Sequence, residues 1–317
     1  MVWVAAVLDR LVIVLTCMWV YIWYFRVVCL HIRITGVFPN PAHPRRLDDK
    51  FLWRKIFDRN PEFVVASDKL ESQILAKLKC PEVLLPRTLW TGFSSSDIPA
   101  DVLSGDVVVK ATHGSGYVFP IFAGQYDSDD LKDKTTAWLK QTFGRRHWEW
   151  GYFGVKPKLY VEEMLLDSEG NYRTTEIKLY VYCGQIKEIV MIYDRLLDGS
   201  ADVLRSDWTA SSAANTIGAA GANRSPPDNR EQIEEVALRL CSGFDHMRCD
   251  LYVVGLDIYF GEYTVYNEGG YLLISGDDEL RREQNEAWDI RQSWFLTNRQ
   301  RGWLGIYAAS LKRRLQE

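Results

Sequence analysis

The sequence lacks the motifs of three large enzyme classes that act on esters or nucleotides. It has no Gly-x-Ser-x-Gly nucleophile elbow, no Gly-x-x-x-x-Gly-Lys-Ser/Thr phosphate loop and no His-Arg-Asp set of the protein kinases. It also has only five histidines, too few to favour a Ser-His-Asp triad. A serine hydrolase, a P-loop nucleotidase and a protein kinase are therefore excluded as interpretations.

Cysteine patterns and positive charge are also missing. The six cysteines form no Cys-x-x-Cys pair and no Cys/His cluster with zinc spacing, which predicts reduced thiols in a cytosolic domain. The formal net charge is −4 and the isoelectric point is near 5.8. No basic field attracts a phosphate backbone, so we expect no nucleic-acid partner.

What the chain does contain is apolar material. Its 317 residues are 47% hydrophobic and 25% charged, enough for real cores in one large lobe or two to three smaller lobes. Residues 11–25 are a continuous uncharged run that follows Asp9 and Arg10, while Arg26 and Arg33 come after it. Because a spanning helix needs ~20 apolar residues and basic residues favour the cytoplasmic side, we expect a membrane anchor or membrane-surface helix on a cytoplasmic protein. A helix packed on the globular body is the alternative.

Helical and strand patterns then follow in a mixed order, which predicts an α+β fold of two lobes. The stretch 196–228 has no apolar period, so we expect a long loop there. The expected helices are 47–57, 67–78, 126–143, 229–244 and the tail after 282. The expected strands are 83–90, 106–110 and 156–165, with hairpins over 175–195 and 247–266.

The stretch VVVKATHGSGYVF, residues 107–119, indicates an anion site. A buried strand delivers Lys110 to a turn in which Gly114 and Gly116 let backbone N–H groups approach a ligand. His-Gly-Ser-Gly also resembles an oxyanion hole, but such a hole needs the nucleophile elbow that the sequence lacks. Phosphates are therefore the favoured anion.

Acidic residues far downstream agree with that interpretation. Asp250 and Glu262 lie on opposite arms of the expected 247–266 hairpin, about equally far from its turn. Carboxylates at such positions are cross-strand neighbours and need a cation between them, which Mg²⁺ with a phosphate chain would supply. Solvated surface charges are the alternative for these acids, for Lys110 and for a second strand lysine, Lys178.

Seven segments in order resemble the ATP-grasp superfamily, and specifically the TupA-like proteins of teichuronopeptide and other surface-polysaccharide biosynthesis. The resemblance covers residues 33–296 and implies an ATP-grasp fold, two α+β lobes that sandwich ATP, preceded here by an N-terminal apolar helix. The segments are RRLDDKFLWRKIFDRNPEF, SDKLESQILAKL, VVVKATHGSG, KPKLYVEEML, EIKLYVYCGQIKEI, MRCDLYVVGLDIYFGEYTVYNEGG and AWDIRQSWFL.

The resemblance also implies roles for particular residues. Lys178 and Arg248 would be catalytic, with Arg248 facing the transferred phosphate, and Asp250 and Glu262 would bind Mg²⁺. Many relatives carry Glu-x-Asn as the second metal motif, whereas Thr264 stands at the third position here, so we expect Thr264 or Asn267 to replace that asparagine. Contacts to ATP would come from Lys110, His113, Gly114, Ser115, Gly116, Glu162, Glu163, Leu165 and Lys178.

The function that follows from this resemblance is a carboxylate–amine ligase that uses ATP and Mg²⁺ through an acyl phosphate. Its acceptor would be a glycan or sugar acid and its second substrate an amino acid or amine. Two alternatives stay open, a nucleotide-binding or inactive scaffold of a membrane-bound assembly complex and a phosphotransferase to a sugar hydroxyl. Arg195 would bind substrate or only pair with Asp194. The expected parts are an apolar helix (1–32), a helical region (33–105), a lid subdomain (106–167), a metal-binding subdomain (168–296) and a helical tail (297–317).

Overall fold

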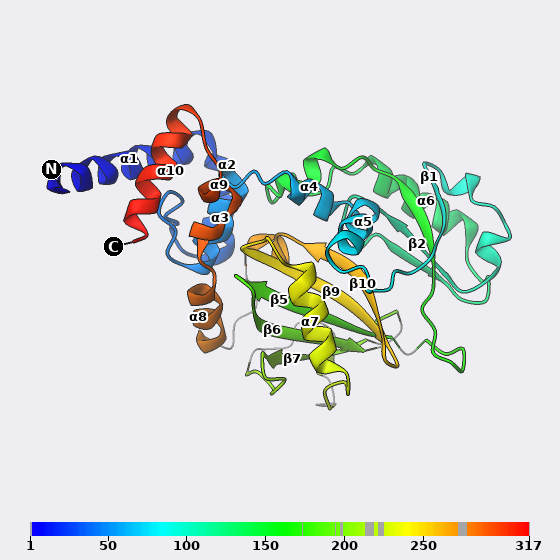
Figure 1. Ribbon diagram of the computed structural model, residues 1–317. Helices are drawn as coiled ribbons and strands as arrows, with labels where there is room; N and C mark the ends of the chain where they lie inside the picture. Colours follow the sequence, from blue (N-terminus) through cyan, green and yellow to red (C-terminus); the bar gives the residue numbers. More distant parts are fainter. Residues whose placement is uncertain are drawn as a thin grey trace.

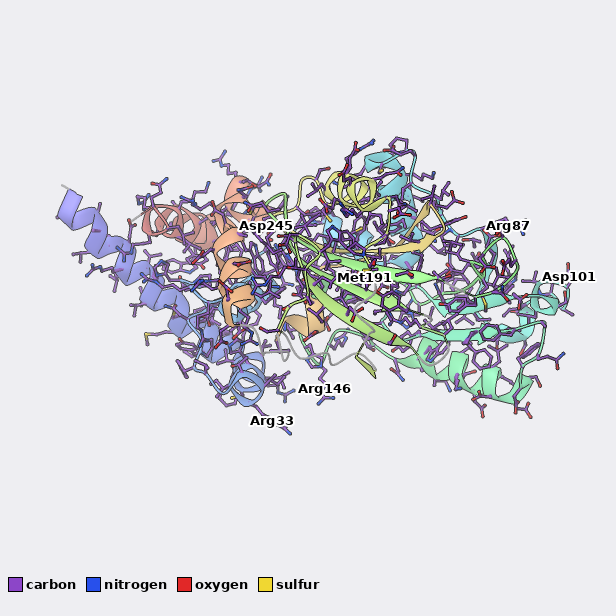
Figure 2. All side chains as sticks on the ribbon, turned by 90° about the horizontal axis from the view of Figure 1, so that it is seen from below. Arg33, Arg87, Asp101, Arg146, Met191 and Asp245 are labelled. Carbon is purple, nitrogen blue, oxygen red and sulfur yellow. The ribbon has the colours of Figure 1, made fainter. Side chains whose placement is uncertain are left out.

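The computed structural model contains two β-sheets and a group of helices that we call the helical module (Figure 1). This arrangement confirms the predicted α+β class. Figure 2 shows Arg33 in the helical module on one side of Met191 of the larger sheet, and Asp101 beside the smaller sheet on the other side. The structure describes residues 2–172, 174–193, 195–196, 199–212, 219–220, 225–271 and 278–316.

The smaller sheet has four antiparallel strands in the order β1-β4-β2-β3. Its inner face is covered by α6, which spans Ser128–Lys140 and begins at Asp127, whose side chain accepts from two backbone N–H groups. Alternate residues of β2 and β4 enter that core, as expected for a sheet with one covered face. The strands are β1 (Thr88–Gly92), β2 (Val107–Ala111), β3 (Val118–Ile121) and β4 (Leu159–Glu163).

The larger sheet has the order β10-β9-β5-β6-β7-β8 and is antiparallel except for the short β7–β8 pair. The predicted hairpin turn at Cys183-Gly184 is confirmed, and both residues have positive φ. In the second hairpin Glu262 pairs with Asp250, as the sequence predicted. The strands are β5 (Thr175–Tyr182), β6 (Gln185–Tyr193), β7 (Ser200–Arg205), β8 (Ala219–Ala220), β9 (His246–Val254) and β10 (Asp257–Thr264).

The two faces of the larger sheet have different coverings. One face packs on α4 (Glu62–Ser67), α5 (Lys69–Lys79) and α7 (Arg230–Leu240) (Figure 1). On the other face, Tyr180 and Tyr182 of β5 enter the core of the helical module. Because β5 alternates faces, Glu176 and Lys178 lie on that same face, farther along the strand.

The helical module brings both ends of the described chain together (Figure 1). Helix α1 packs along α10, and Arg313 forms an ion pair with the buried Asp9. The expected N-terminal helix and the expected tail are therefore parts of one module, whereas β1, within the expected helical region 33–105, belongs to the smaller sheet. The module consists of α1 (Val2–Trp23), α2 (Phe25–Thr35), α3 (Leu47–Ile56), α8 (Asp278–Ala287), α9 (Trp294–Thr297) and α10 (Gly302–Arg314).

Candidate active site

A cavity of about 80 Å³ lies between the two sheets and collects most of the charged residues that the sequence singled out. Strands β2 and β4 supply one wall, strands β5, β9 and β10 supply the other, and the glycine turn after β2 closes one side. Its charged and polar lining residues are Lys69, Lys110, Ser115, Tyr160, Glu162, Glu163, Tyr172, Thr174, Glu176, Arg195, Tyr252 and Glu262.

Lys110 extends from β2 and forms an ion pair with Glu162 on the neighbouring strand β4. Both side chains are almost fully buried, and the ring of Tyr252 lies 5.6 Å from the Lys110 ammonium. Burial alone lowers the pKa of Lys110, but the negative charge of Glu162 outweighs it and the pKa is raised well above its ordinary value. Lys110 is therefore a fixed cation in the cavity.

Asp250 is held by cations on both sides. Arg248 Nε and Nη2 donate to its two carboxylate oxygens at 2.7 Å each, and Lys178 Nζ donates to Oδ2 at 2.6 Å. Lys178 also donates to Glu176 at 2.6 Å. Burial would raise the pKa of Asp250, yet the Arg248 and Lys178 charges lower it strongly. Strands β5 and β9 thus hold a cluster of paired charges, and Glu176 of this cluster lines the cavity.

Glu262, across from Asp250 on β10, forms an ion pair with Lys69. Its other carboxylate oxygen lies 3.7 Å from Arg248 Nη2. Burial and the charge of Lys110 lower the pKa of Lys69 to about 7. Lys69 is the first residue of α5, placed there by the Asp68 cap, although a cation opposes the helix dipole at this end.

The glycine turn divides into residues that face the cavity and residues that do not. Ser115 and Gly116 line the cavity, and Gly116 has φ +78°, a conformation that glycine adopts readily. His113 instead packs against Tyr117, and its Nε2 lies 2.9 Å from the Trp138 carbonyl. Gly114 leaves room for the Tyr117 ring, since a Cβ there would come within 2.4 Å of it. His113 and Gly114 therefore shape the turn from behind.

Glu163 and Leu165 also line the cavity, beyond Glu162. Glu163 forms an ion pair with Arg87 at 3.3 Å and accepts a hydrogen bond from its backbone N–H at 2.9 Å. Arg195 lines the cavity too and pairs with Glu176, while Asp194 lies outside the described residues.

The structure does not bring Asn267 to this cavity. Its Nδ2 donates to His246 Nε2 at 3.1 Å, in a buried cluster under the helical module. Thr264 lines a neighbouring cavity instead. The further carboxylate in this cluster is Glu176, which shares Lys178 with Asp250. The sequence analysis did not predict Glu176, although its position two residues before Lys178 on one strand could have indicated it.

Lys69 and Tyr252, which line the cavity, were also not among the sequence predictions. Lys69 carries a signal in hindsight, because a lysine directly after an Asp helix cap is placed against the helix dipole. Tyr252 carries none, since an aromatic residue on an alternating strand is most often part of a core.

Carboxylate oxygens are the ligands that Mg²⁺ prefers, and this ion is commonly held by one or two carboxylates plus substrate phosphates. Asp250 and Glu262, on paired strands, fit that donor set. No group of three or more His, Cys, Asp or Glu side chains suited to hold a metal is present among the described residues. The site therefore suits an ion that arrives with its phosphates better than a preformed metal cage.

Comparison with known families decides the fold. The family model of the TupA-like ATP-grasp proteins matches residues 49–283. The chain belongs to the TupA-like ATP-grasp family. The expected ATP-grasp fold is thereby confirmed, and the cavity lies between the two sheets that this fold contributes.

Several solved ligases match the chain at low sequence identity. D-alanine–D-alanine ligase from Bacillus anthracis, complexed with ATP, is 14% identical over 70% of this chain and 65% of the ligase, with a TM-score of 0.38. The ligase PsnB, complexed with a precursor variant, Mg and ADP, is 12% identical over 81% of this chain and 61% of its own, with a TM-score of 0.39. L-amino acid ligase from Bacillus licheniformis is 13% identical over 76% of this chain and 51% of the ligase, with a TM-score of 0.39.

This TupA-like chain therefore spans about half to two thirds of the length of those ligases. No curated protein matches its sequence.

Proposed function

We propose that this TupA-like protein is a carboxylate–amine ligase that consumes Mg-ATP in the cavity between its sheets. The observation that carries the proposal is a group of charges at one place: Lys69, Lys110 and Glu262 line this cavity, and Asp250, the strand neighbour of Glu262, is held there by Lys178 and Arg248. Cations and backbone N–H groups suit a polyphosphate, and the two carboxylates suit its magnesium.

The two ends of the cavity suit the two ends of ATP. Lys110, Lys178 and Arg248 would hold the phosphates, with Ser115 and Gly116 of the turn over them. Glu162, Glu163 and Leu165 lie where an adenine and ribose would enter, beside Val108 and Tyr160. Asp250 and Glu262 would hold the magnesium ion, which supplies charge neutralisation at the phosphates.

The chemistry would proceed through an acyl phosphate. A substrate carboxylate attacks the γ-phosphorus, and the bond from that phosphorus to ADP breaks. The amine then attacks the acyl carbon and phosphate leaves. Lys178 and Arg248 would stabilise charge on the transferred group, which is the main task of a protein in phosphoryl transfer. A glycan or sugar acid is the proposed acceptor, in surface-polysaccharide synthesis.

A purified-protein screen tests this proposal. Mg-ATP would be supplied with uronate-containing glycans and each amino acid, and ADP, phosphate and the amide product would be measured. Amide formation that disappears in Lys178→Met supports the ligase. ADP formation with sugar phosphate and no amide would instead indicate a phosphotransferase.

One observation favours the scaffold as second candidate. Asp250 has both oxygens engaged by cations, and Asn267 lies outside the cavity. Calorimetry separates the candidates, because Mg-dependent ATP binding that is weakened in Glu262→Gln supports the enzyme. Metal-independent binding, or none, would favour the scaffold.

We also propose that α1 attaches the protein to the cytoplasmic face of a membrane. Among the described residues, one helix, Val4–Trp23, is long and apolar enough to cross a membrane, with a mean hydropathy of 1.9. Its Asp9, Thr16 and Val20 are buried against the module, while its other side is exposed and apolar. Flotation of the full chain with anionic lipid vesicles tests this, and a chain that stays with the soluble fraction would contradict it.

A further inference from the structure

A second cavity, of about 200 Å³, lies beside the first and shares Ser115 and Glu262 with it. Arg248, which grips Asp250, also lines this second cavity. Any molecule bound there would face the end of the first cavity where the cations gather. The remaining lining residues are Phe143, His147, Glu149, Tyr152, Thr264, Tyr266, Glu268 and Gly269.

Two irregular segments build its walls. One joins α6 to β4 and turns sharply at Gly144, whose φ is +78° and whose carbonyl accepts from the Glu149 backbone N–H at 2.9 Å. The other follows β10, where Glu268 and Gly269 also have positive φ. A Cβ on Gly269 would lie 3.3 Å from the His147 ring, so glycine lets the two segments touch.

Glu149 is the unusual residue of this cavity. Only 6% of it is exposed, yet no hydrogen bond or ion pair within 4 Å holds its carboxylate among the described residues. Lys55 donates to the Gly269 carbonyl, and its positive charge acts electrostatically on the Glu149 carboxylate. Burial raises the pKa of Glu149 to about 7, and the Lys55 charge opposes the rise. An unpaired buried carboxylate is costly, so a cationic ligand that pairs with it is favoured.

The rest of the lining suits the same kind of ligand. Glu262 and Glu268 add negative charge, while Phe143, Tyr152 and Tyr266 present aromatic rings that attract ammonium groups and cover an apolar body. The buried Tyr266 hydroxyl has no hydrogen-bond partner among the described residues and is available to a ligand.

We propose that this second cavity binds the amine substrate of the ligase as its ammonium ion, with Glu149 as counter-ion and proton acceptor. The assignment rests on the proposed ligase function. One proton passes from the ammonium to Glu149, and the free amine forms a C–N bond to the acyl carbon as the C–O bond to phosphate breaks. Phosphate takes the electron pair of that bond and the second proton, which leaves the neutral amide.

Binding of small probes tests this without knowledge of the natural substrate. L-alaninamide carries an ammonium group and no carboxylate, and N-acetyl-L-alanine has the opposite charge. Saturation-transfer NMR on the full chain should detect L-alaninamide in preference to N-acetyl-L-alanine. Glu149→Gln should weaken L-alaninamide at least about tenfold, the loss expected for one charge-assisted hydrogen bond. Glu149→Asp should retain part of the affinity.

Two controls keep this result interpretable. Glu235→Gln, on the exposed side of α7, changes charge equally and should leave the affinity for L-alaninamide unchanged. Mg-ATP binding to Glu149→Gln should equal that of the wild type, which also shows that the variant is folded. Equal L-alaninamide affinity in wild type and Glu149→Gln, or preference for N-acetyl-L-alanine, would overturn the amine site. Failure of the wild type to bind Mg-ATP would overturn the ligase proposal and not the cation site.

Discussion

The molecule contains two buried networks of charge that differ in what their cations touch. In the cavity between the sheets, Lys110 and Lys178 are paired with carboxylates and line or adjoin open space. Under the helical module, Arg54 pairs with Asp245 and also donates to a backbone carbonyl, that of His246, at 2.9 Å. The cavity pairs therefore have side-chain partners that a ligand can replace, whereas the module pairs are tied to the backbone.

The module network is packed as well as paired. The Arg54 guanidinium is fully buried and lies 4.5 Å from the Trp288 ring, and Trp288 donates to Asp245 at 2.7 Å. Removal of the Arg54 guanidinium takes a donor away from both Asp245 Oδ1 and the His246 carbonyl. The comparison teaches that burial and pairing alone do not mark a functional charge; replaceable partners beside a cavity do.

The largest expected effect is on the module side. Arg54→Met should lower the free energy of unfolding by about 3–5 kcal/mol, because Asp245 and the His246 carbonyl lose their partner. Chemical denaturation measures this. The matched control is Arg239→Met, which breaks a surface pair with Glu82 and should change the free energy of unfolding far less. Equal losses of unfolding free energy in Arg54→Met and Arg239→Met would contradict a special structural role for the buried network.

Loss of a charge pair in the cavity should weaken ligand binding and leave stability unchanged. The double variant Lys110→Met/Glu162→Gln removes both members of a pair, so its stability should equal or exceed that of the wild type. The Kd for Mg-ATP should rise about 10–100-fold, since one charge-assisted contact is lost. Calorimetric titration gives the affinity. A double variant that unfolds easily and still binds Mg-ATP would show that the pair is structural.

Glu262→Gln should weaken Mg-ATP about tenfold and reduce the dependence on magnesium. The physical reason is the loss of one of the two carboxylates proposed to bind magnesium, Asp250 on β9 and Glu262 on β10. Titrations at two magnesium concentrations measure both effects. Glu231→Gln on α7 is the control, and an identical magnesium dependence in both variants would argue against Glu262 as a ligand.

The smallest expected effect is a pH dependence of stability that comes from His246, in the buried network under the helical module. His246 donates from Nδ1 to Val181 O and accepts from Asn267, so the folded protein holds it neutral; burial lowers its pKa well below the ordinary value. The unfolded chain takes up that proton below about pH 6.5, so stability falls as pH drops through this value, by up to about 1.4 kcal/mol per unit. Unfolding of the wild type and His246→Gln between pH 5 and 7 measures the difference. Parallel curves would contradict it.

The sheets were accessible from the sequence because strands carry local signals. Alternation and turn residues predicted both hairpins, and equal distances from the turn predicted the Asp250–Glu262 pair. The helical module was not accessible, since periodicity in α1 and α10 gives a buried face but not its partner some 300 residues away.

Within the candidate site, residues on strands were predictable and residues in irregular turns were not. Lys110, Glu162 and Glu262 stand on strands whose faces can be counted, and the structure brings them to one cavity. Asn267 and Glu149 follow irregular turns, where no period predicts the direction of a side chain. Their positions depend on positive-φ residues and tertiary contacts.

The central claim is that Mg-ATP replaces the carboxylate partners of the cavity cations, such as Glu162 at Lys110. Unfolding with and without Mg-ATP tests this claim most directly. At a concentration 100 times Kd, Mg-ATP should raise the free energy of unfolding of the wild type by about 2.7 kcal/mol. The Lys110→Met/Glu162→Gln variant should match the wild type without ligand and gain much less with it. Equal gains in the two proteins, or no gain in the wild type, would contradict the account.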